Sequence, residues 1–291
     1  MIRLDASSVL LQWATGGLLF LWVTTRRRLV GVGYGWLLRS VYGVIALGAV
    51  AAGRAAPPSP LRDAGAALTA AAAAGALVVS VRRRRAGVAG ERRERQRRAA
   101  RVAAMTGEPS GDDDRADGAP TAGPGLREFP PALDLVAPAF GAVGLVAAAV
   151  SAGGGHALAV VRTLAGAGFL GAVSDAMLLG HWYLVQPGLR RDPLLELNRW
   201  LARLWPVEVA ALVWPPGMVS VLTGRVDDGW GGVLGWFWLA CAVTTLVLTF
   251  VTRAALRERA YSAVMAATGL LYLAILTAFG TDLIARAVLA G

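Results

Sequence analysis

The residues that could do chemistry in this sequence interrupt long apolar stretches. Most are ionisable, and ionisable side chains are expensive to place in a bilayer and usually mark a ligand site or a proton pathway. Tyrosines at nearby positions can donate hydrogen bonds to the same ligand. No residue has a pattern that indicates a catalytic nucleophile. The candidate ligand-binding or proton-relay residues are Arg39, Tyr42, Asp175, His181, Tyr183 and Glu208.

Helical rise predicts that three of these side chains lie at similar depth. At 1.5 Å per residue, Arg39 is about 12 Å, His181 about 9 Å and Glu208 about 6 Å from the cytoplasmic ends of their predicted helices. Asp175 lies nearer the midplane on the same helix as His181. We therefore expect one polar pocket in the cytoplasmic half of the helix bundle.

Helical phase refines the expected partners. Ser174 and His181 share one helix face, whereas Asp175 faces elsewhere, so His181 and Asp175 are not a direct pair. We expect Arg39 to pair with Asp175 or with Glu208 from another helix. Arg162, near the far end of its long helix, is expected to extend into the lipid headgroups. A purely structural ion pair with a hydrogen-bonded histidine is the alternative interpretation.

Rare residue types exclude several kinds of site. The basic residues are all arginine, which removes a lysine Schiff base, and the single Cys241 removes an intramolecular disulfide or a CxxC site. The two histidines, His156 and His181, are about 37 Å apart on one helix, too far to ligate one haem or metal. Ser174 and His181 are about 10 Å apart, too far for a nucleophile and its base. No metal site is expected.

Apolar blocks of about twenty residues must position these side chains. The chain has 291 residues, of which 56% are hydrophobic and only 16% charged, with a mean hydropathy of +0.54. Such composition and block length predict an all-α, polytopic helical membrane protein with about eight transmembrane helices. The third helix is rich in alanine and is expected to pack inside the bundle. The predicted spans are 7–25, 31–53, 64–81, 132–152, 157–186, 204–222, 230–252 and 260–281.

Arginine placement predicts the orientation. Of the 29 arginines, 22 lie in loops on one side of the predicted membrane and 5 on the other. The positive-inside rule then places both termini outside and the arginine-rich loops in the cytoplasm, in the cell (inner) membrane. The first helix is trailed by Arg26, Arg27 and Arg28, which does not fit a cleaved signal peptide.

A long cytoplasmic loop divides the predicted helices into two parts. Residues 1–81 form a three-helix part, 82–130 the loop and 131–291 a five-helix part. The loop begins with a basic stretch from Arg82 to Arg101, which suits anionic lipids of the inner leaflet rather than nucleic acid. It then becomes acidic and rich in Gly and Pro, which favours disorder.

Three functions remain open from the sequence. The first is a membrane subunit that binds a quinone in the polar pocket and receives electrons from redox partner subunits, because the chain lacks its own haem or metal ligands. The second is a proton-coupled transporter of small molecules that uses Asp175 and Glu208 as titrating groups near proline-interrupted helix 204–222. The third is a non-catalytic assembly or scaffold protein. Whether the chain is an enzyme is left open.

Overall fold

A computed structural model describes most of the chain. The described residues are 5–55, 57–86, 128–151, 156–186, 189–215, 217–258 and 260–290. The predicted loop falls largely outside them, from 87 to 127, and so do most arginines of the basic stretch that we expect to contact anionic lipids.

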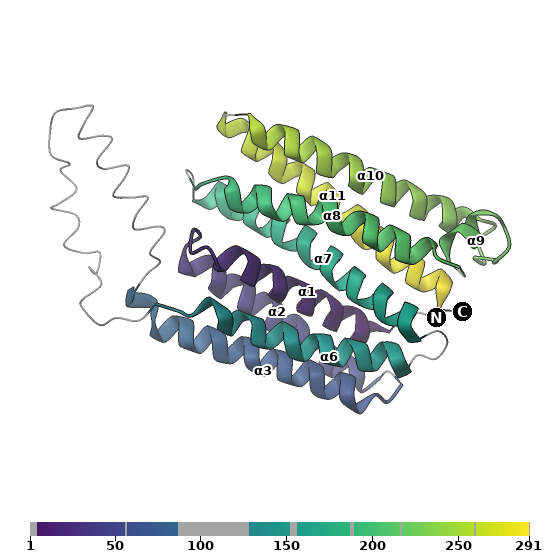
Figure 1. Ribbon diagram of the computed structural model, residues 1–291, viewed down its shortest axis with the longest axis horizontal. Coiled ribbons are helices and arrows are strands. Elements are labelled where there is room, and N and C mark those ends of the chain that lie inside the picture. The colour runs from purple at the N-terminus through teal and green to yellow at the C-terminus, as the bar shows by residue number, and fades with distance from the viewer. Residues whose placement is uncertain are drawn as a thin grey trace, which may run out of the picture.

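Regular structure in the described ranges is helical, and eight long helices run back and forth along one direction (Figure 1). The first bundle contains α1 (Ala6–Thr25), α2 (Val32–Gly53), α3 (Pro60–Arg82) and α6 (Val136–Ser151), which is entered through the 3-10 turn η2 (Pro131–Leu135). The second bundle contains α7 (His156–Val185), α8 (Asp192–Val213), α10 (Val233–Arg257) and α11 (Tyr261–Leu289). The short elements η1 (Arg84–Ala86) and α9 (Met218–Leu222) follow α3 and α8.

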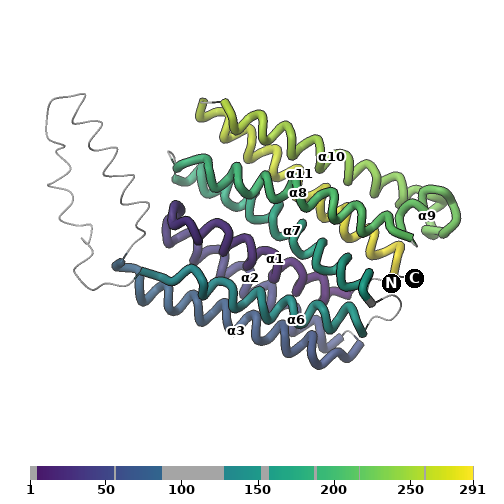
Figure 2. The backbone as a smooth tube through the Cα atoms, in the orientation of Figure 1, coloured from purple at the N-terminus to yellow at the C-terminus, as the bar shows by residue number. Residues whose placement is uncertain are grey.

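Each set of four helices closes into a ring. In the first bundle α1 packs on α2, α2 on α3, α3 on α6 and α6 on α1. The second bundle repeats this order with α7, α8, α10 and α11, and α7 joins the two rings by packing on α1 and α6. Packing thus groups the helices four and four, whereas their order about the loop suggested three and five. Figure 2 shows the two bundles side by side.

The alanine-rich helix α3 lies at the edge of the first bundle, not inside the protein as expected. Its outward face carries the half-exposed Leu68 and Val78. Small residues still allow close approach to its ring neighbours α2 and α6: a Cβ on Gly65 would lie 2.7 Å from the Cα of Gly144 in α6. Helix α3 is therefore covered by two neighbours, and its remaining face is exposed.

Helix α8 begins well before the predicted span at 204–222. Leu194, Leu197 and Leu201 recur every three or four residues and are all buried, so the segment that read as a polar loop is the amphipathic first half of α8. The helix ends ahead of Pro215, which cannot continue the backbone ladder. The predicted single span is therefore a long helix, a break and the short α9.

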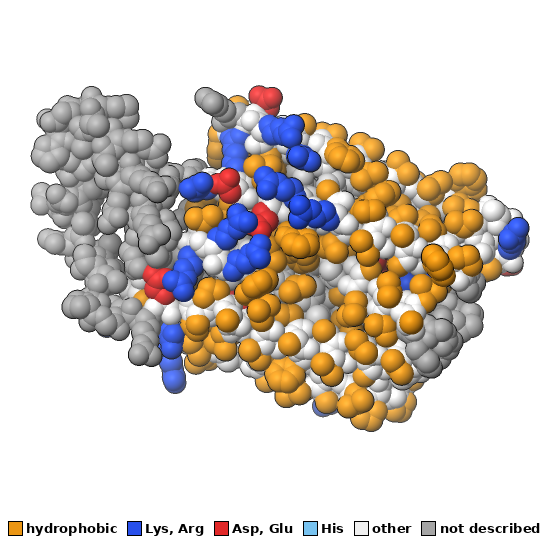
Figure 3. All heavy atoms as spheres, in the orientation of Figure 1, with side chains coloured by type: hydrophobic (Ala, Val, Ile, Leu, Met, Phe, Trp, Pro, Cys, Tyr) orange, Lys and Arg blue, Asp and Glu red, His pale blue; other side chains and the backbone are white. Residues whose placement is uncertain are grey.

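Seven of the described helices are long and apolar enough to cross a membrane, which is consistent with a helical membrane protein. Helix α8 lies alongside them but is too rich in charged residues to join this set. A broad hydrophobic surface covers the middle of the visible face, and arginines gather toward one end (Figure 3). We name this the arginine-rich end. Both chain termini lie at the other, the terminal end (Figure 1).

Candidate functional site

Polar side chains connect the two bundles along their contact, which we call the seam. They come from α1, α2 and the turn between them on one side, and from α7, α8 and α11 on the other. At the core of the seam α1 and α7 touch backbone to backbone, because a Cβ on Gly171 would lie 2.1 Å from the carbonyl carbon of Gly16. The polar contacts occur at three depths around this crossing.

The central contact is made by Asp175. This residue is wholly buried in α7, and Tyr42, midway along α2, donates a hydrogen bond of 2.5 Å to its Oδ1. Its Oδ2 has no hydrogen-bond partner among the described residues. The hydroxyl of Tyr34 donates to the backbone carbonyl of the same residue at 3.3 Å. The Asp175 carboxyl group and backbone carbonyl of α7, in the second bundle, therefore both accept hydrogen bonds from tyrosines of α2, in the first bundle.

A neighbouring contact extends this central layer. The indole Nε1 of Trp13 in α1 donates to Ser174 Oγ at 2.9 Å, and the Trp13 ring packs edge-on against Phe279 of α11 with centroids 4.9 Å apart. Ser174 of α7 thus accepts a hydrogen bond across the seam from α1. It is not a partner of His181, with which it was expected to share a face.

An ion-pair group bridges the seam at the arginine-rich end. Glu196 of α8 accepts from Arg26 at 2.5 Å through Oε1 and from Arg27 at 3.1 Å through Oε2. Both arginines belong to the turn that connects α1 to α2, so the pair ties the first bundle to the second. Two cations on one nearly buried carboxylate hold this end of the seam together.

A buried ionic cluster occupies the seam toward the terminal end. Asp282 of α11 accepts from Arg286 at 2.7 Å and from the Gln12 amide of α1 at 3.2 Å. Glu208 lies close enough to interact electrostatically with Asp282, Arg286 and Arg162, and it is wholly buried. Its carboxyl oxygens make no hydrogen bond of good geometry to the described residues. Two carboxyl groups and two guanidinium groups thus meet in one apolar environment.

The sequence predicted that Arg162 extends into the lipid headgroups, but in the structure its side chain is buried. It is 2% exposed and donates to the carbonyls of Ala211 at 2.9 Å and Trp214 at 2.8 Å. These carbonyls lie at the end of α8, where the break before Pro215 removes their helical partners. The cation therefore caps the broken helix, which also suits the negative end of its dipole.

Arg39 pairs with neither Asp175 nor Glu208. Its Nε and Nη2 each lie 2.8 Å from a carboxylate oxygen of Asp134 in η2, and its Nη1 lies 3.3 Å from Ser80 Oγ. The Phe129 ring covers the guanidinium at 4.3 Å. The expected pairing was wrong because the segment after the long loop brings its own carboxylate to the arginine-rich end of α2.

His181 and Tyr183 also lie outside the expected pocket. His181 is exposed on the bundle surface, where its Nδ1 lies 3.1 Å from the Tyr272 hydroxyl of α11. Tyr183 donates at 2.5 Å to the carbonyl of Arg190 in the turn that follows α7. The structure thus separates the six candidate residues, and of these only Tyr42 and Asp175 form a pair.

Glu208 is likewise in the other half of the bundle from the one expected. It lies 16 residues, or about 24 Å, from the start of α8 at the arginine-rich end. Its depth was misjudged because the helix begins twelve residues before the predicted start. Sequence reasoning also missed Asp134 and Asp282. Asp134 is the third residue of the predicted span 132–152 and Asp282 lies one residue beyond the span 260–281, so neither was counted among the charges inside the membrane.

Comparison of the chain with protein-family models, curated proteins and solved structures finds no match. Within the described ranges no group of three or more His, Cys, Asp or Glu side chains gathers in a way that could hold a metal ion. The polar groups of the seam described above are carboxyl, hydroxyl, amide, indole and guanidinium groups.

Proposed function

We propose that this chain is a membrane carrier that couples the movement of a small solute to that of a proton, with Asp175 as the proton-binding group. The observation that carries the proposal is the position of Asp175 in the seam. It is wholly buried and bonded to Tyr42 of the opposite bundle. Its second oxygen lacks a hydrogen-bond partner among the described residues.

The arrangement of two four-helix bundles supports this function. Many carriers bind substrate and coupling ion near the membrane midplane, between two halves that move against each other. Tyr42 lies ten residues from the start of α2 and eleven from its end, so its contact with Asp175 is central to that helix. Glu196 with its two arginines closes the seam at the arginine-rich end. In the proposed orientation the protein lies in the inner membrane and this end faces the cytoplasm.

The second carboxyl layer gives the proton a place to go. Gly166 lies beside Gln12 and Asp282, and it precedes Asp175 by nine residues on α7, or about 14 Å. When the two bundles separate, a proton would pass between Asp175 and Asp282 by way of water or the bound solute. Glu208 belongs to the layer at the terminal end, where we propose that it exchanges protons with Asp282.

Proton flux into liposomes tests the proposal. The purified protein is reconstituted with an internal pH-sensitive dye, a potassium diffusion potential is imposed, and a panel of amino acids, sugars and organic acids is added outside. We expect at least one solute to evoke proton entry that is lost at least tenfold in Asp175→Asn and reduced in Tyr42→Phe. Asp192→Asn, which changes an exposed carboxylate, is the matched control.

Two results contradict the proposal. One is the absence of solute-dependent proton entry above protein-free liposomes across the whole panel. The other is wild-type flux in Asp175→Asn protein that is folded by its elution profile and thermal transition.

A quinone site is the second candidate, and the exposed pair of His181 and Tyr272 favours it. An imidazole and a phenol at 3.1 Å on the surface of α7 and α11 offer a quinone carbonyl two hydrogen-bonding groups directly from the lipid phase. Electrons would come from redox partner subunits. Extraction of the purified protein and chromatography of the extract test this candidate. A quinone present in wild type and absent in His181→Ala supports it, and its absence from both contradicts it.

A further inference from the structure

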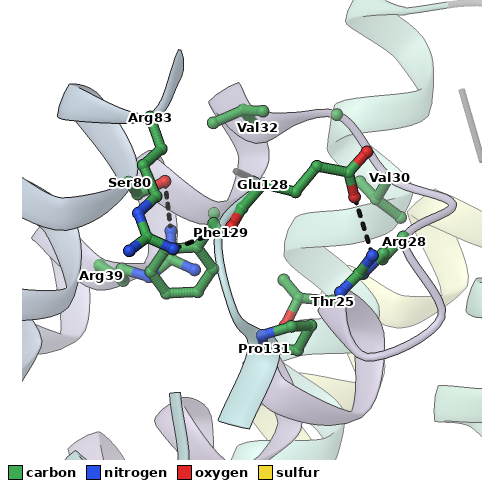
Figure 4. A pocket seen from close by; sticks show the side chains of 12 residues that line it. Thr25, Arg28, Val30, Val32, Arg39, Ser80, Arg83, Glu128, Phe129 and Pro131 are labelled. Atoms are coloured by element: carbon green, nitrogen blue, oxygen red, sulfur yellow. Dashed lines mark hydrogen bonds and ion pairs between the residues drawn. The ribbon is translucent and has the colours of Figure 1, made fainter. Parts of the chain in front are cut away.

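A small pocket opens at the arginine-rich end of the first bundle, away from the seam contacts described above. It lies between the turn after α1, the start of α2, the end of α3 and the segment that leads into η2. Three guanidinium groups line it, from Arg28, Arg39 and Arg83, together with the carboxylate of Glu128 (Figure 4). The remaining wall is largely apolar and is formed by Val30, Val32, Phe129 and Pro131.

The charges around this pocket do not balance. Asp134 neutralises Arg39 through two hydrogen bonds of 2.8 Å, and Glu128 neutralises Arg28 at 2.9 Å. Within the described ranges, Arg83 donates from Nη1 to the backbone carbonyl of Glu128 at 3.0 Å, and no carboxylate there forms a salt bridge with it. One positive charge with several remaining N–H donors is therefore available to an anion at the pocket.

The start of α2 adds to the attraction for an anion. Gly31, Val32 and Gly35 form part of the wall, and no side chain caps this helix terminus. The first N–H groups of a helix have no partners within the helix and carry partial positive charge, which favours phosphate-like groups. A Cβ on Gly35 would lie 2.7 Å from Nη1 of Arg39, so a larger residue there would require the Arg39 side chain to shift.

The volume of the pocket limits the size of the ligand that it can hold. Its volume is about 50 Å³, far below the roughly 300–1,000 Å³ of sites that enclose a cofactor or a drug-sized molecule. One water needs about 10–15 Å³ on this measure, so the pocket holds roughly four atoms of that size. That is the oxygen shell of one phosphate group. A quinone ring or a nucleotide does not fit.

We infer that this pocket binds one phosphate group, held by Arg83 with Arg28 and by the N-terminus of α2. The apolar wall suits the phosphodiester of an anionic phospholipid, whose chains remain in the bilayer. Inorganic phosphate presents the same oxygens and is the second source. The inference does not depend on the carrier function, because none of the pocket residues supplies a side chain to Asp175.

Two binding measurements on the full-length protein test the inference. In the first, the protein is placed in nanodiscs that contain phosphatidylglycerol in an excess of phosphatidylcholine, extracted into detergent and examined for retained lipid by native mass spectrometry. In the second, inorganic phosphate is added to the delipidated protein and its thermal transition is followed. Retained phosphatidylglycerol identifies a lipid ligand, and a phosphate-dependent shift alone identifies free phosphate.

Variants distinguish binding of the phosphate group in this pocket from its general attraction to arginines on the protein surface. We expect Arg83→Gln to reduce the bound ligand at least tenfold, since hydrogen bonds to a charged group are strong enough for such a loss. Val32→Phe fills the pocket without removing charge and is expected to have the same effect. Arg253→Gln removes an exposed arginine elsewhere at the same end and should leave binding unchanged. Equal losses in Arg83→Gln and Arg253→Gln, or no binding of either ligand by wild type, would overturn the inference.

Discussion

Substitution of Asp134 by Asn tests whether Arg39 depends on this carboxylate. The pair is nearly inaccessible, with the side chains 3% and 1% exposed, and it is bidentate at 2.8 Å. Removal of one charge leaves the guanidinium buried without its counter-ion, which typically costs about 3–5 kcal/mol. At roughly 2–4 °C per kcal/mol for a chain of this size, we expect the unfolding temperature to fall by roughly 6–20 °C.

The same chain offers a matched control. Arg190 and Asp192 form an ion pair at 2.9 Å whose side chains are 46% and 50% exposed. Water already solvates both charges, so Asp192→Asn is expected to cost less than about 1 kcal/mol. Tryptophan fluorescence of the detergent-solubilised protein during heating measures both variants.

A double variant distinguishes lost charge from lost packing. Arg39→Met combined with Asp134→Leu removes both charges together, and replacing a buried pair with apolar residues is often close to neutral. We therefore expect the double variant to be more stable than Asp134→Asn alone. The reasoning is refuted if Asp134→Asn unfolds within a degree or two of Asp192→Asn, or if the double variant is the least stable of the three.

Three further predictions concern the close helix crossing, the cap of the broken helix and the loop before α10. Gly171→Ala should lower stability by about 1–3 kcal/mol because the added Cβ meets the Gly16 backbone at 2.1 Å, whereas Gly75→Ala, with nothing within 4 Å, should not, and thermal unfolding compares them. Arg162→Met should cost about 3 kcal/mol or more, since two carbonyls lose a charged donor, and chemical unfolding of the purified protein measures it. Asp228 has its pKa lowered by backbone N–H donors, first that of Gly232, so its contribution to stability is complete above pH ~4 and is lost as the pH falls through the lowered pKa. The protection factors of the amide hydrogens at the start of α10, which are exchange rates corrected for the intrinsic effect of pH, should therefore fall as the pH falls in wild type and be low throughout in Asp228→Asn.

The long helices could be predicted from the sequence because their apolar blocks are as long as a bilayer is thick. Helix α8 could not, since Arg199 and Arg203 made its first half read as a loop although their exposed side chains lie on the outer face of an amphipathic helix. The extent of α11 was also underestimated: the predicted span ends at 281, but the helix continues to Leu289. Asp282 and Arg286 were therefore counted as loop residues rather than as buried charges.

The candidate site was predicted in part. Burial of Asp175 follows from its central place in an apolar stretch, and Tyr42 was chosen for a similar reason. The partner of each buried polar side chain depends on which helices become neighbours. The periodicity of the sequence does not show that the helices pack four and four. Asp134 shows the consequence, since its pairing with Arg39 requires α6 to close the first ring between α3 and α1.

That ring closure has a consequence for biosynthesis. Asp134 follows Arg39 by 95 residues, and a chain made at about 5–20 residues per second delivers it roughly 5–20 s later. Once α3 has been made, in the later part of this interval, α1, α2 and α3 exist, but the guanidinium of Arg39 lacks its carboxylate and one side of the ring is open. The newly made three-helix intermediate must therefore be sheltered by the insertion machinery, by lipid headgroups or by water until α6 arrives.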